Sequence, residues 1–324
     1  MTVVVTGAAG FIGYHVTLAL LARGERVVGI DIVNDYYDVG LKEARLAHLA
    51  NHTGFVFHRA DIADAEAVSA IFAGAGAVSG IVHLAAQAGV RYSLTNPYAY
   101  VHSNLLGQVA MFEATRRLDP LPALVYASSS SVYGGNTKFP FSVADRVDHP
   151  VSLYAATKRG GELLAESYAA VYGMPSTGLR FFTVYGPWGR PDMAYFSFTK
   201  AILAGEPIPV FNKGKLERDF TYIDDAVAGV LAAFDRPADA GQPHRVYNLG
   251  NNKPEPLLRF IEVIETALGC KATLDFQPMQ PGDVKATAAD IDDSTRDLGF
   301  LPRISLDEGI PRFVSWYKDY YGIA

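Results

Sequence analysis

Cysteine is almost absent from the sequence, with Cys270 the single one among 324 residues. One cysteine cannot form an intramolecular disulfide or supply a cysteine-ligated zinc site, and such low use is typical of a reducing compartment. Basic residues are also in deficit, with 28 Lys and Arg against 34 Asp and Glu. The net charge of −6 argues against nucleic-acid binding, which requires a basic surface.

Long apolar runs are missing as well. No stretch of about 18 uninterrupted apolar residues occurs, so we expect no membrane-spanning helix. Met1 is followed directly by an apolar segment, without the charged, apolar and small-residue regions of a signal peptide. The eight His residues lack paired spacing on a helix, so we expect no metal site. These absences predict a cytoplasmic protein that binds neither a membrane nor a metal.

The composition itself is globular, with 49% hydrophobic and 19% charged residues, and the length predicts two domains or one large α/β domain. Through the first half, short apolar segments without polar alternation come between helical patterns, as strands buried on both faces do. We therefore predict an α/β fold with a doubly wound parallel sheet. The predicted strands are 2–6, 26–31, 53–59, 80–84, 123–127 and 176–180, and the predicted helices are 13–23, 41–50, 64–72, 97–118 and 153–172.

The second half loses this rhythm after Phe181. Turn-forming Gly and Pro dominate 186–191 (GPWGRP), yet 246–249 (VYNL) again has the pattern of a sheet strand. We therefore predict two interleaved domains without a clean linker. The large sheet belongs to 1–180 and 223–252, and a smaller α/β domain belongs to 181–222 and 253–324.

Three glycines, Gly7, Gly10 and Gly13, separate the first predicted strand from the first predicted helix. Glycine there permits a tight turn and a close approach to a pyrophosphate, and the helix N-terminus offers free N–H groups to the phosphates. A plain tight turn is the alternative for the glycines alone. Asp31, at the end of the next strand, favours a dinucleotide site, because a carboxylate there binds ribose hydroxyls and repels a 2′-phosphate. We predict NAD rather than NADP.

Two further segments come directly after strands, at the carboxyl edge of the sheet, where ligands bind in such folds. They are Asp61–Ile62 and 84–87 (LAAQ). Asp61 has two open interpretations, a contact with the adenine amino group or a cap for the helix that starts near Asp64.

Tyr154 and Lys158 open the helix after the fifth strand, one turn apart on the same face. A neighbouring ammonium lowers the pKa of a tyrosine and makes it a usable base. An ordinary amphipathic pair is the alternative. Four serines, 128–131, end the preceding strand and offer hydroxyls to a substrate, unless they form a flexible loop with no coupling to Tyr154.

Taken together, these features resemble a known family, the extended short-chain dehydrogenase/reductases that act on nucleotide sugars. The resemblance rests on GAAGFIG (7–13), Asp31, HLAAQ (83–87), YASSSSVYG (126–134), YAATK (154–158), RFFTVYGPWGRPDMA (180–194), RDFTYIDD (218–225) and PGDV (281–284). It covers essentially the whole chain and is greatest to the UDP-glucuronate 4-epimerases. It implies a Rossmann-type NAD-binding domain, a UDP-sugar-binding domain, and a tightly held NAD that is reduced and reoxidised within one turnover.

The resemblance also implies residue roles. Tyr154 resembles the base that takes the C4 hydroxyl proton. Lys158 would bind the nicotinamide ribose and hold the phenolate form, and Ser129 resembles the residue that relays or orients the proton. The 4-keto sugar would then turn over in the site and take the hydride back on its other face. Ser128 and Ser130 would assist in binding the sugar. The implied NAD-binding residues are Gly7, Gly10, Phe11, Ile12, Gly13, Asp31, Asp61, Ile62, Leu84, Ala85, Ala86, Gln87, Asn104, Tyr154, Lys158 and Phe181.

The loop after the fifth strand distinguishes the types of reaction in this family. Related dehydratases carry an Asp-Glu pair there and related decarboxylases a Glu, because chemistry at C5 needs an acid or base. This chain has Ser130 and Ser131 instead, which favours simple C4 epimerisation.

The preference for a uronic acid rests on Thr183 and Arg190, as donors to the C6 carboxylate. Many relatives carry Asn in place of Thr183. Arg190 has an alternative role, an ion pair with Asp192 in the same turn. Arg91 is another candidate for an anionic group.

For UDP, the resemblance implies Arg218 at the pyrophosphate, Val210 and Phe211 beside uracil, and Asp283 near the nucleotide. Phe211 has core packing as its alternative. Relatives often carry Arg where this chain has Gln280, so one phosphate contact of the family is missing.

The predicted activity is therefore the interconversion of UDP-glucuronate and UDP-galacturonate. UDP-glucose 4-epimerisation is the first alternative and UDP-glucuronate decarboxylation a less favoured one. An inactive NAD-binding scaffold has no need of Tyr154, Lys158 and Ser129 together. The resemblance further implies a homodimer, in which the helices at 97–118 and 153–172 pair as a four-helix bundle.

Overall fold

A large parallel sheet forms the centre of the computed structural model, which describes residues 1–280 and 284–323. Within these residues the sheet has seven strands in the order β10-β6-β5-β4-β1-β2-β3, and every neighbouring pair is parallel. This confirms the predicted doubly wound sheet. The strands are β1 (Thr2–Thr6), β2 (Arg26–Asp31), β3 (Phe55–Arg59), β4 (Val78–His83), β5 (Ala123–Ser129), β6 (Ser176–Phe181) and β10 (His244–Leu249).

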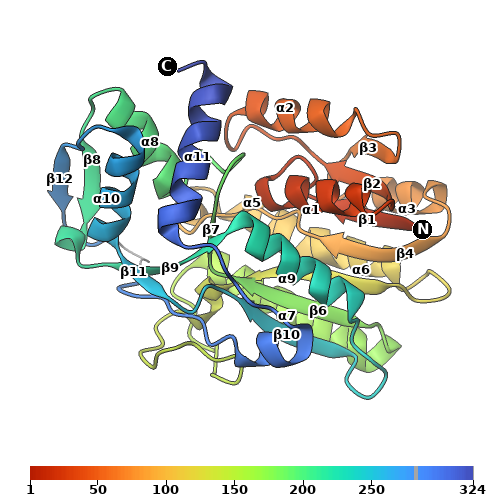
Figure 1. Ribbon diagram of the computed structural model, residues 1–324. Coiled ribbons are helices and arrows are strands. Elements are labelled where there is room, and N and C mark those ends of the chain that lie inside the picture. Colours follow the sequence, from red (N-terminus) through yellow and green to blue (C-terminus); the bar gives the residue numbers. More distant parts are fainter. Residues whose placement is uncertain (281–283, 324) are drawn as a thin grey trace.

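Helices cover both faces of this sheet (Figure 1). Helix α1 (Phe11–Ala22) packs between α2 (Val39–Leu49) and α9 (Ile223–Asp235) on one face. On the other face lie α3 (Ala65–Gly74), α6 (Gly107–Thr115) and α7 (Leu153–Tyr172). Because the chain switches faces between α2 and α3, the strand order reverses at β1, and the carboxyl ends of β1 and β4 open onto a crevice.

The helix predicted at 97–118 is three segments rather than one. A π-helical turn, η1 (His102–Leu106), separates α5 (Pro97–Val101) from α6, and the short α4 (Tyr92–Thr95) precedes them. Buried Asn104 lies in the π-helical turn, a place where such turns often serve a site. The helix also ends at Thr115, three residues earlier than predicted.

A smaller group of elements lies beyond the carboxyl edge of the large sheet, at the left of Figure 1. Three strands pair in the order β11-β9-β7, and two more, β8 and β12, pair in parallel. Their bounds are β7 (Thr183–Tyr185), β8 (Ile208–Phe211), β9 (Glu217–Tyr222), β11 (Pro254–Pro256) and β12 (Leu274–Gln277). The remaining helices are α8 (Ala194–Leu203), α10 (Leu257–Leu268), α11 (Leu306–Tyr321) and the short η2 (Ser130–Tyr133), η3 (Asn212–Gly214) and η4 (Ser294–Leu298).

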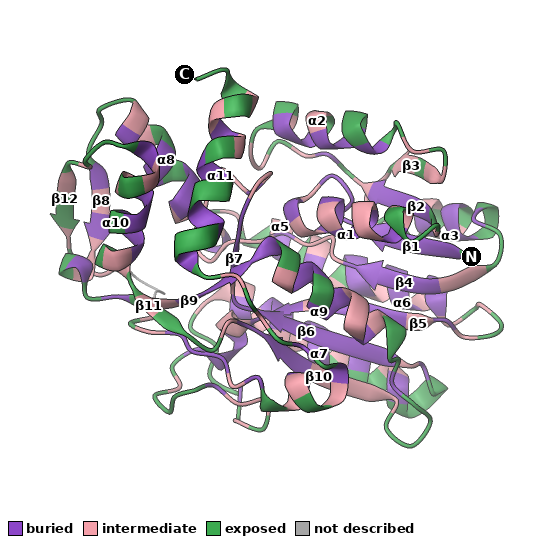
Figure 2. Cartoon of the chain, in the orientation of Figure 1, coloured by how far each residue is buried: buried purple, intermediate pink, exposed green. Residues whose placement is uncertain are grey.

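The hydrophobic core continues from the large sheet into these smaller elements. One cluster of buried side chains includes Val3 and Val5 of β1, Phe181 at the end of β6, and Phe260 and Phe313 of α10 and α11. Figure 2 shows the central strands of the large sheet buried, in contrast to the edge strand β3, and the exposed residues on the outer helices and loops. This shared core holds the ends of β5 and β6 rigidly against the smaller elements, where the site lies.

None of the helices within residues 1–280 and 284–323 combines the length and apolarity needed to span a bilayer.

Candidate active site

The glycine-rich turn closes tightly between β1 and α1. Gly7 has φ +74°, and a Cβ on it would lie 2.8 Å from the backbone nitrogen of Ala85. A Cβ on Gly13 would lie 2.0 Å from the carbonyl oxygen of Gly7. Both positions therefore require glycine for the turn itself, which lets the first turn of α1 begin at Phe11 and face the crevice.

Asp31 lies beside this turn, at the end of β2. Its two carboxylate oxygens accept hydrogen bonds from the backbone N–H of Val33 (2.8 Å) and of Ala9 (3.1 Å). Burial raises the pKa of Asp31, while these bonds and the charges of Lys42 and Arg45 oppose the rise. A carboxylate fixed in this way retains lone pairs for the hydroxyls of a ribose.

One cavity collects the residues predicted to bind NAD. It runs from the glycine-rich turn and Asp31 to Lys158 and Phe181, and all of the predicted NAD-binding residues line it except Asn104. The dinucleotide fits these residues, because the cavity joins a free helix N-terminus, a ribose-binding carboxylate and the Tyr-Lys pair.

Asn104 acts beside the cavity rather than in its wall. Its amide nitrogen donates to the carbonyl of Gln87 and to the hydroxyl of Thr157, both at 3.0 Å, and its amide oxygen accepts from the Gln87 N–H at 2.8 Å. Asn104 therefore fixes the segment after β4 against α7.

Asp61 lines the cavity and is not the helix cap that was its alternative. The cap of α3 is Asp64, which accepts from Glu66 N and Ala67 N. Asp61 instead accepts from Ala63 N at 2.9 Å and pairs with His102 Nε2 at 2.8 Å.

The predicted catalytic residues come together where β5 meets α7. Ser152 caps α7 by accepting from Ala155 N at 3.1 Å, so Tyr154 lies in its first turn and Lys158 one turn later. Lys158 Nζ donates to the Ala127 carbonyl at 2.9 Å. The Ser129 hydroxyl accepts from Ser131 Oγ at 2.9 Å, and its interaction with Tyr154 lowers the pKa of that tyrosine. Ser129 is therefore coupled to Tyr154.

Burial shifts both titrating groups. It raises the pKa of Tyr154, and what opposes the rise is the hydrogen bond of Ser129 and the charge of Arg190, rather than Lys158 as the sequence suggested. Burial lowers the pKa of Lys158 to about 8, against the carboxylate of Glu162, which raises it. Without a nearby cation Tyr154 would be a poor base at neutral pH.

A second cavity adjoins the first. Ser129, Tyr154 and Arg190 line both, so they form part of the wall between them. Of the other predicted substrate residues, Ser130, Thr183 and Arg218 line the second cavity. Ser128 lines the first, but its hydroxyl is held by Glu162 at 2.6 Å.

Arg190 forms the ion pair that was its alternative role. Its Nη2 lies 2.6 Å from Asp192 Oδ2, and the Tyr36 hydroxyl donates to the same carboxylate at 3.1 Å. The guanidinium is thus paired while it lines both cavities.

The remaining predicted substrate residues lie outside the described cavities. Arg91 stacks on the ring of Phe211, 5.1 Å from its centroid, so these two residues contact each other. Val210 is fully buried in β8 and packs in the core. Asp283 lies outside the described residues.

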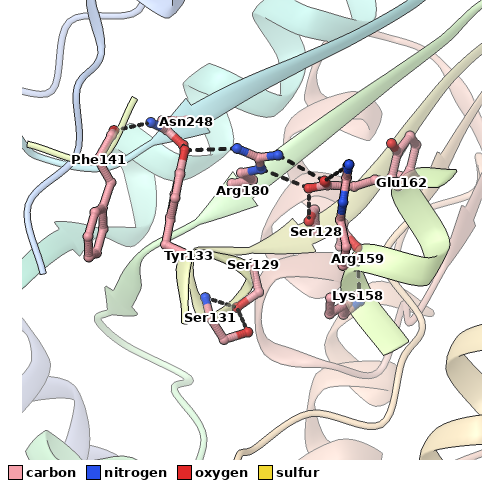
Figure 3. A network of polar contacts seen from close by, with 12 residues as sticks. Ser128, Ser129, Ser131, Tyr133, Phe141, Lys158, Arg159, Glu162, Arg180 and Asn248 are labelled. Atoms are coloured by element: carbon pink, nitrogen blue, oxygen red, sulfur yellow. Dashed lines mark hydrogen bonds and ion pairs between the residues drawn. The ribbon is translucent and has the colours of Figure 1, made fainter. Parts of the chain in front are cut away.

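A buried ion pair behind the site was not predicted. Glu162 of α7 accepts two hydrogen bonds from Arg180 of β6, at 2.8 and 2.9 Å (Figure 3). Its one sequence signal is that Glu162 continues the four-residue spacing of Tyr154 and Lys158.

The family is decided by a match over most of the chain: a family model described as the NAD dependent epimerase/dehydratase family covers residues 3–250. The chain belongs to this family. It is 48% identical to UDP-glucuronate 4-epimerase 1 of Arabidopsis thaliana over 335 residues, which are 99% of this chain and 78% of that protein. It is 46% identical to protein CapI of Staphylococcus aureus, over 99% of both chains.

Solved structures agree with this placement. The UDP-glucuronic acid 4-epimerase from Bacillus cereus, in complex with UDP-glucuronic acid and NAD, superposes with a TM-score of 0.89 at 35% identity, covering 99% of this chain and 100% of that one. A UDP-glucose 4-epimerase from Thermotoga maritima has the same TM-score at 28% identity, with 99% and 100% coverage. Membership of this family confirms the predicted NAD cofactor and the predicted class of enzyme.

Proposed function

We propose that this protein is a UDP-glucuronate 4-epimerase that interconverts UDP-glucuronate and UDP-galacturonate. The observation that carries the proposal is the shared wall of the two cavities. Tyr154, Ser129 and Arg190 line the NAD cavity and also the second cavity. A sugar in the second cavity would therefore contact these residues and lie next to the NAD cavity. Similarity to UDP-glucuronate 4-epimerases of Arabidopsis thaliana supports the same substrate.

The residues divide the proton chemistry between them. NAD, held by the residues of the first cavity, would supply the hydride acceptor and donor that C4 of the sugar needs. Tyr154 takes the proton of the C4 hydroxyl as base, and returns it as acid when the hydroxyl forms again. Ser129 stabilises the phenolate by a hydrogen bond, and Lys158 holds the nicotinamide ribose beside it.

Epimerisation is favoured over elimination or decarboxylation by the residues that line the second cavity. Among the described residues, no Asp or Glu lines it. A reaction at C5 needs a carboxylate there to move the C5 proton. Serines at 129–131 instead offer hydroxyls, which bind a sugar without removing protons from its carbon atoms.

The C6 carboxylate is assigned to Thr183 and Arg190. Both line the second cavity, and an arginine fork matches a carboxylate in geometry and charge. Arg218 is assigned to the pyrophosphate, and Arg91, Phe211 and the backbone at Val210 to the far end of UDP. Ser128 and Ser130 support the sugar, Ser128 through its bond with Glu162.

UDP-glucose 4-epimerisation is the second candidate, and one observation favours it. Asp192 already neutralises Arg190, which reduces the positive charge offered to a uronate. The test compares kcat/KM for UDP-glucuronate and UDP-galactose with purified protein and no added NAD. We expect a clear preference for UDP-glucuronate, whereas equal values would assign the enzyme to neutral sugars.

The quaternary structure and location belong to the same proposal. Apolar side chains are exposed on the helices expected to form the four-helix bundle, with Tyr98 exposed by 84% and Leu106 and Leu163 by about half. We propose that these residues form a homodimer interface, and that the enzyme works in the cytoplasm. Tyr98→Glu should then yield a monomer in light scattering.

We further assign NAD binding to 1–180 with 223–252, and UDP-sugar binding to 181–222 with 253–324.

A further inference from the structure

Three successive residues at the carboxyl end of β5 interact with side chains of α7. The Ala127 carbonyl accepts from Lys158 Nζ at 2.9 Å, and the Ser128 hydroxyl donates to Glu162 Oε1 at 2.6 Å. The Ser129 hydroxyl interacts with Tyr154 and lowers the pKa of that tyrosine. The three side chains of α7 follow one another at intervals of one helical turn, so the strand end and the catalytic face of the helix are joined at three points.

Glu162 is the least accessible of these contacts. It is 1% exposed, and Arg180, its bidentate partner, is 3% exposed (Figure 3). Arg159 adds a third charged contact at 3.0 Å. A buried ion pair is a poor source of stability, because an apolar pair of similar volume is often as stable. Stability alone therefore does not explain the ion pair. Glu162 lies one turn from Lys158, which suggests a role in the reaction.

The surroundings of Lys158 show which role. The titratable and charged groups that face it are Tyr154 and Glu162 on its own helix and His83 on β4, with Arg180 of β6 behind Glu162. Burial lowers the pKa of His83 to about 3, so it is neutral. Burial also lowers the pKa of Lys158 to about 8, and the carboxylate of Glu162 opposes this. Among these groups Glu162 is the one anion at neutral pH.

We propose that Glu162 is a positioning residue for the reaction: it holds the end of β5 through Ser128, and, one helical turn from Lys158, it supplies the counter-charge of that ammonium. The inference rests on the proposed roles of Tyr154 and Lys158.

Arg180 extends the same network to the second cavity. Its Nη1 donates to the Tyr133 hydroxyl at 3.0 Å, and Tyr133 donates to Asn248 Oδ1 at 2.6 Å. Asn248 Nδ2 then donates at 2.8 Å to the carbonyl of Phe141, which lines that cavity. Figure 3 shows these hydrogen bonds. Glu162 is therefore joined to Ser128, which lines the first cavity, and to Phe141, which lines the second.

Glu162→Gln is the direct test, because the amide keeps the shape and the bond to Ser128 and removes the charge. The alkaline limb of the kcat profile is the pH range in which kcat falls as Lys158 loses its proton. In Glu162→Gln we expect this fall at a pH about one unit lower, so that kcat above the wild-type limb is about tenfold lower. KM for the UDP-sugar should be nearly unchanged. Glu162→Asp keeps the charge, so kcat should fall at nearly the same pH as in the wild type.

Two variants separate this effect from lost stability. Glu166 lies one turn further along α7, its carboxylate is 67% exposed, and it pairs with His244. Glu166→Gln removes this pair and should leave the alkaline limb at the wild-type pH. The double variant Glu162→Gln/Arg180→Met leaves no unpaired buried charge. A purely structural role predicts that the double variant regains the wild-type limb; the proposal predicts that its limb stays shifted.

A measurement without turnover completes the test. The folded-state pKa of Lys158 lies below its unfolded value, so the unfolded chain binds more protons between the two values and stability rises with pH there. Removing the Glu162 charge lowers the folded value, so this rise should begin at lower pH in urea unfolding between about pH 7 and pH 9.5. Onset at the wild-type pH in Glu162→Gln overturns the proposal. A wild-type chain inactive on UDP-sugars refutes the proposed function instead, so the two failures are distinct.

Discussion

Arg190 Nη2 lies 2.6 Å from Asp192 Oδ2, at the wall between the two cavities. The positive charge of Arg190, which is proposed to bind the carboxylate of the uronic acid, is thus already balanced by Asp192. Burial lowers the pKa of Arg190, but the charge and hydrogen bond of Asp192 outweigh it and raise the pKa above its ordinary value, so the guanidinium stays charged at any working pH. A substrate carboxylate must share it with Asp192, which makes the pair a control on sugar preference.

The first prediction concerns this pair. Arg190→Gln should raise KM for UDP-glucuronate by about tenfold, equivalent to about 1.4 kcal/mol of binding, because a charge-assisted contact is lost. Asp192→Asn should lower the same KM, because the guanidinium no longer shares its charge. UDP-galactose kinetics on the same variants are the control, and parallel changes for both sugars would contradict the role in uronate recognition.

Tyr154→Phe should reduce kcat by about 10²- to 10⁴-fold, the range for loss of a general base. Fold and NAD content should be retained, since the substitution removes one hydroxyl and keeps the ring that packs against Tyr100. Tyr168→Phe is a matched control on the same helix, where the hydroxyl donates to Glu113 at 2.8 Å, away from both cavities. Substantial turnover in Tyr154→Phe would refute the mechanism.

The pH profile should show the titration of Lys158. Burial lowers its pKa to about 8, and the ammonium is the form proposed to hold the ribose of the nicotinamide. Activity should therefore be lost as pH rises through about 8 and be steady just below it. Lys158→Arg, whose guanidinium does not titrate in this range, should abolish that limb. A wild-type profile that is flat well above this pH would contradict the assignment.

Gly13→Ala should destabilise the protein by about 3 kcal/mol, within the range for severe single substitutions. The new Cβ would lie 2.0 Å from the Gly7 carbonyl oxygen, so the turn must open and NAD content should fall. Gly74→Ala, in α3 with no atom within 4 Å of the new Cβ, should be neutral or stabilising by up to about 1 kcal/mol. Chemical denaturation of both variants checks the pair, and equal stabilities would show that the turn tolerates a side chain.

The large sheet was predictable because its central strands are buried on both faces. Val3, Val4 and Val5 carry no polar alternation, and each such segment is followed by a helical pattern. The π-helical turn at 102–106 was not, because its residues, HSNLL, carry no pattern that separates a wide turn from an ordinary helical one. Only the buried bonds of Asn104 to the neighbouring elements reveal why it is there.

The site was predictable as far as its motifs are local. Gly7, Asp31, Tyr154 and Lys158 each stand at a recognisable place relative to a strand or helix, and the structure brings them to one cavity. Contacts across the fold were not predictable. The partner of Glu162 lies in an apolar strand, and becomes evident only when β6 is placed beneath α7. The contact of Arg91 with Phe211 likewise depends on how the smaller elements pack.

The most direct test of the proposed reaction uses UDP-glucuronate labelled with deuterium at C4, incubated with purified protein and no added NAD. We predict UDP-galacturonate that retains the deuterium at C4, with no NADH in solution and no UDP-pentose, because the hydride leaves and returns within one active site. Loss of the label to solvent, or a UDP-pentose as the main product, would contradict this mechanism.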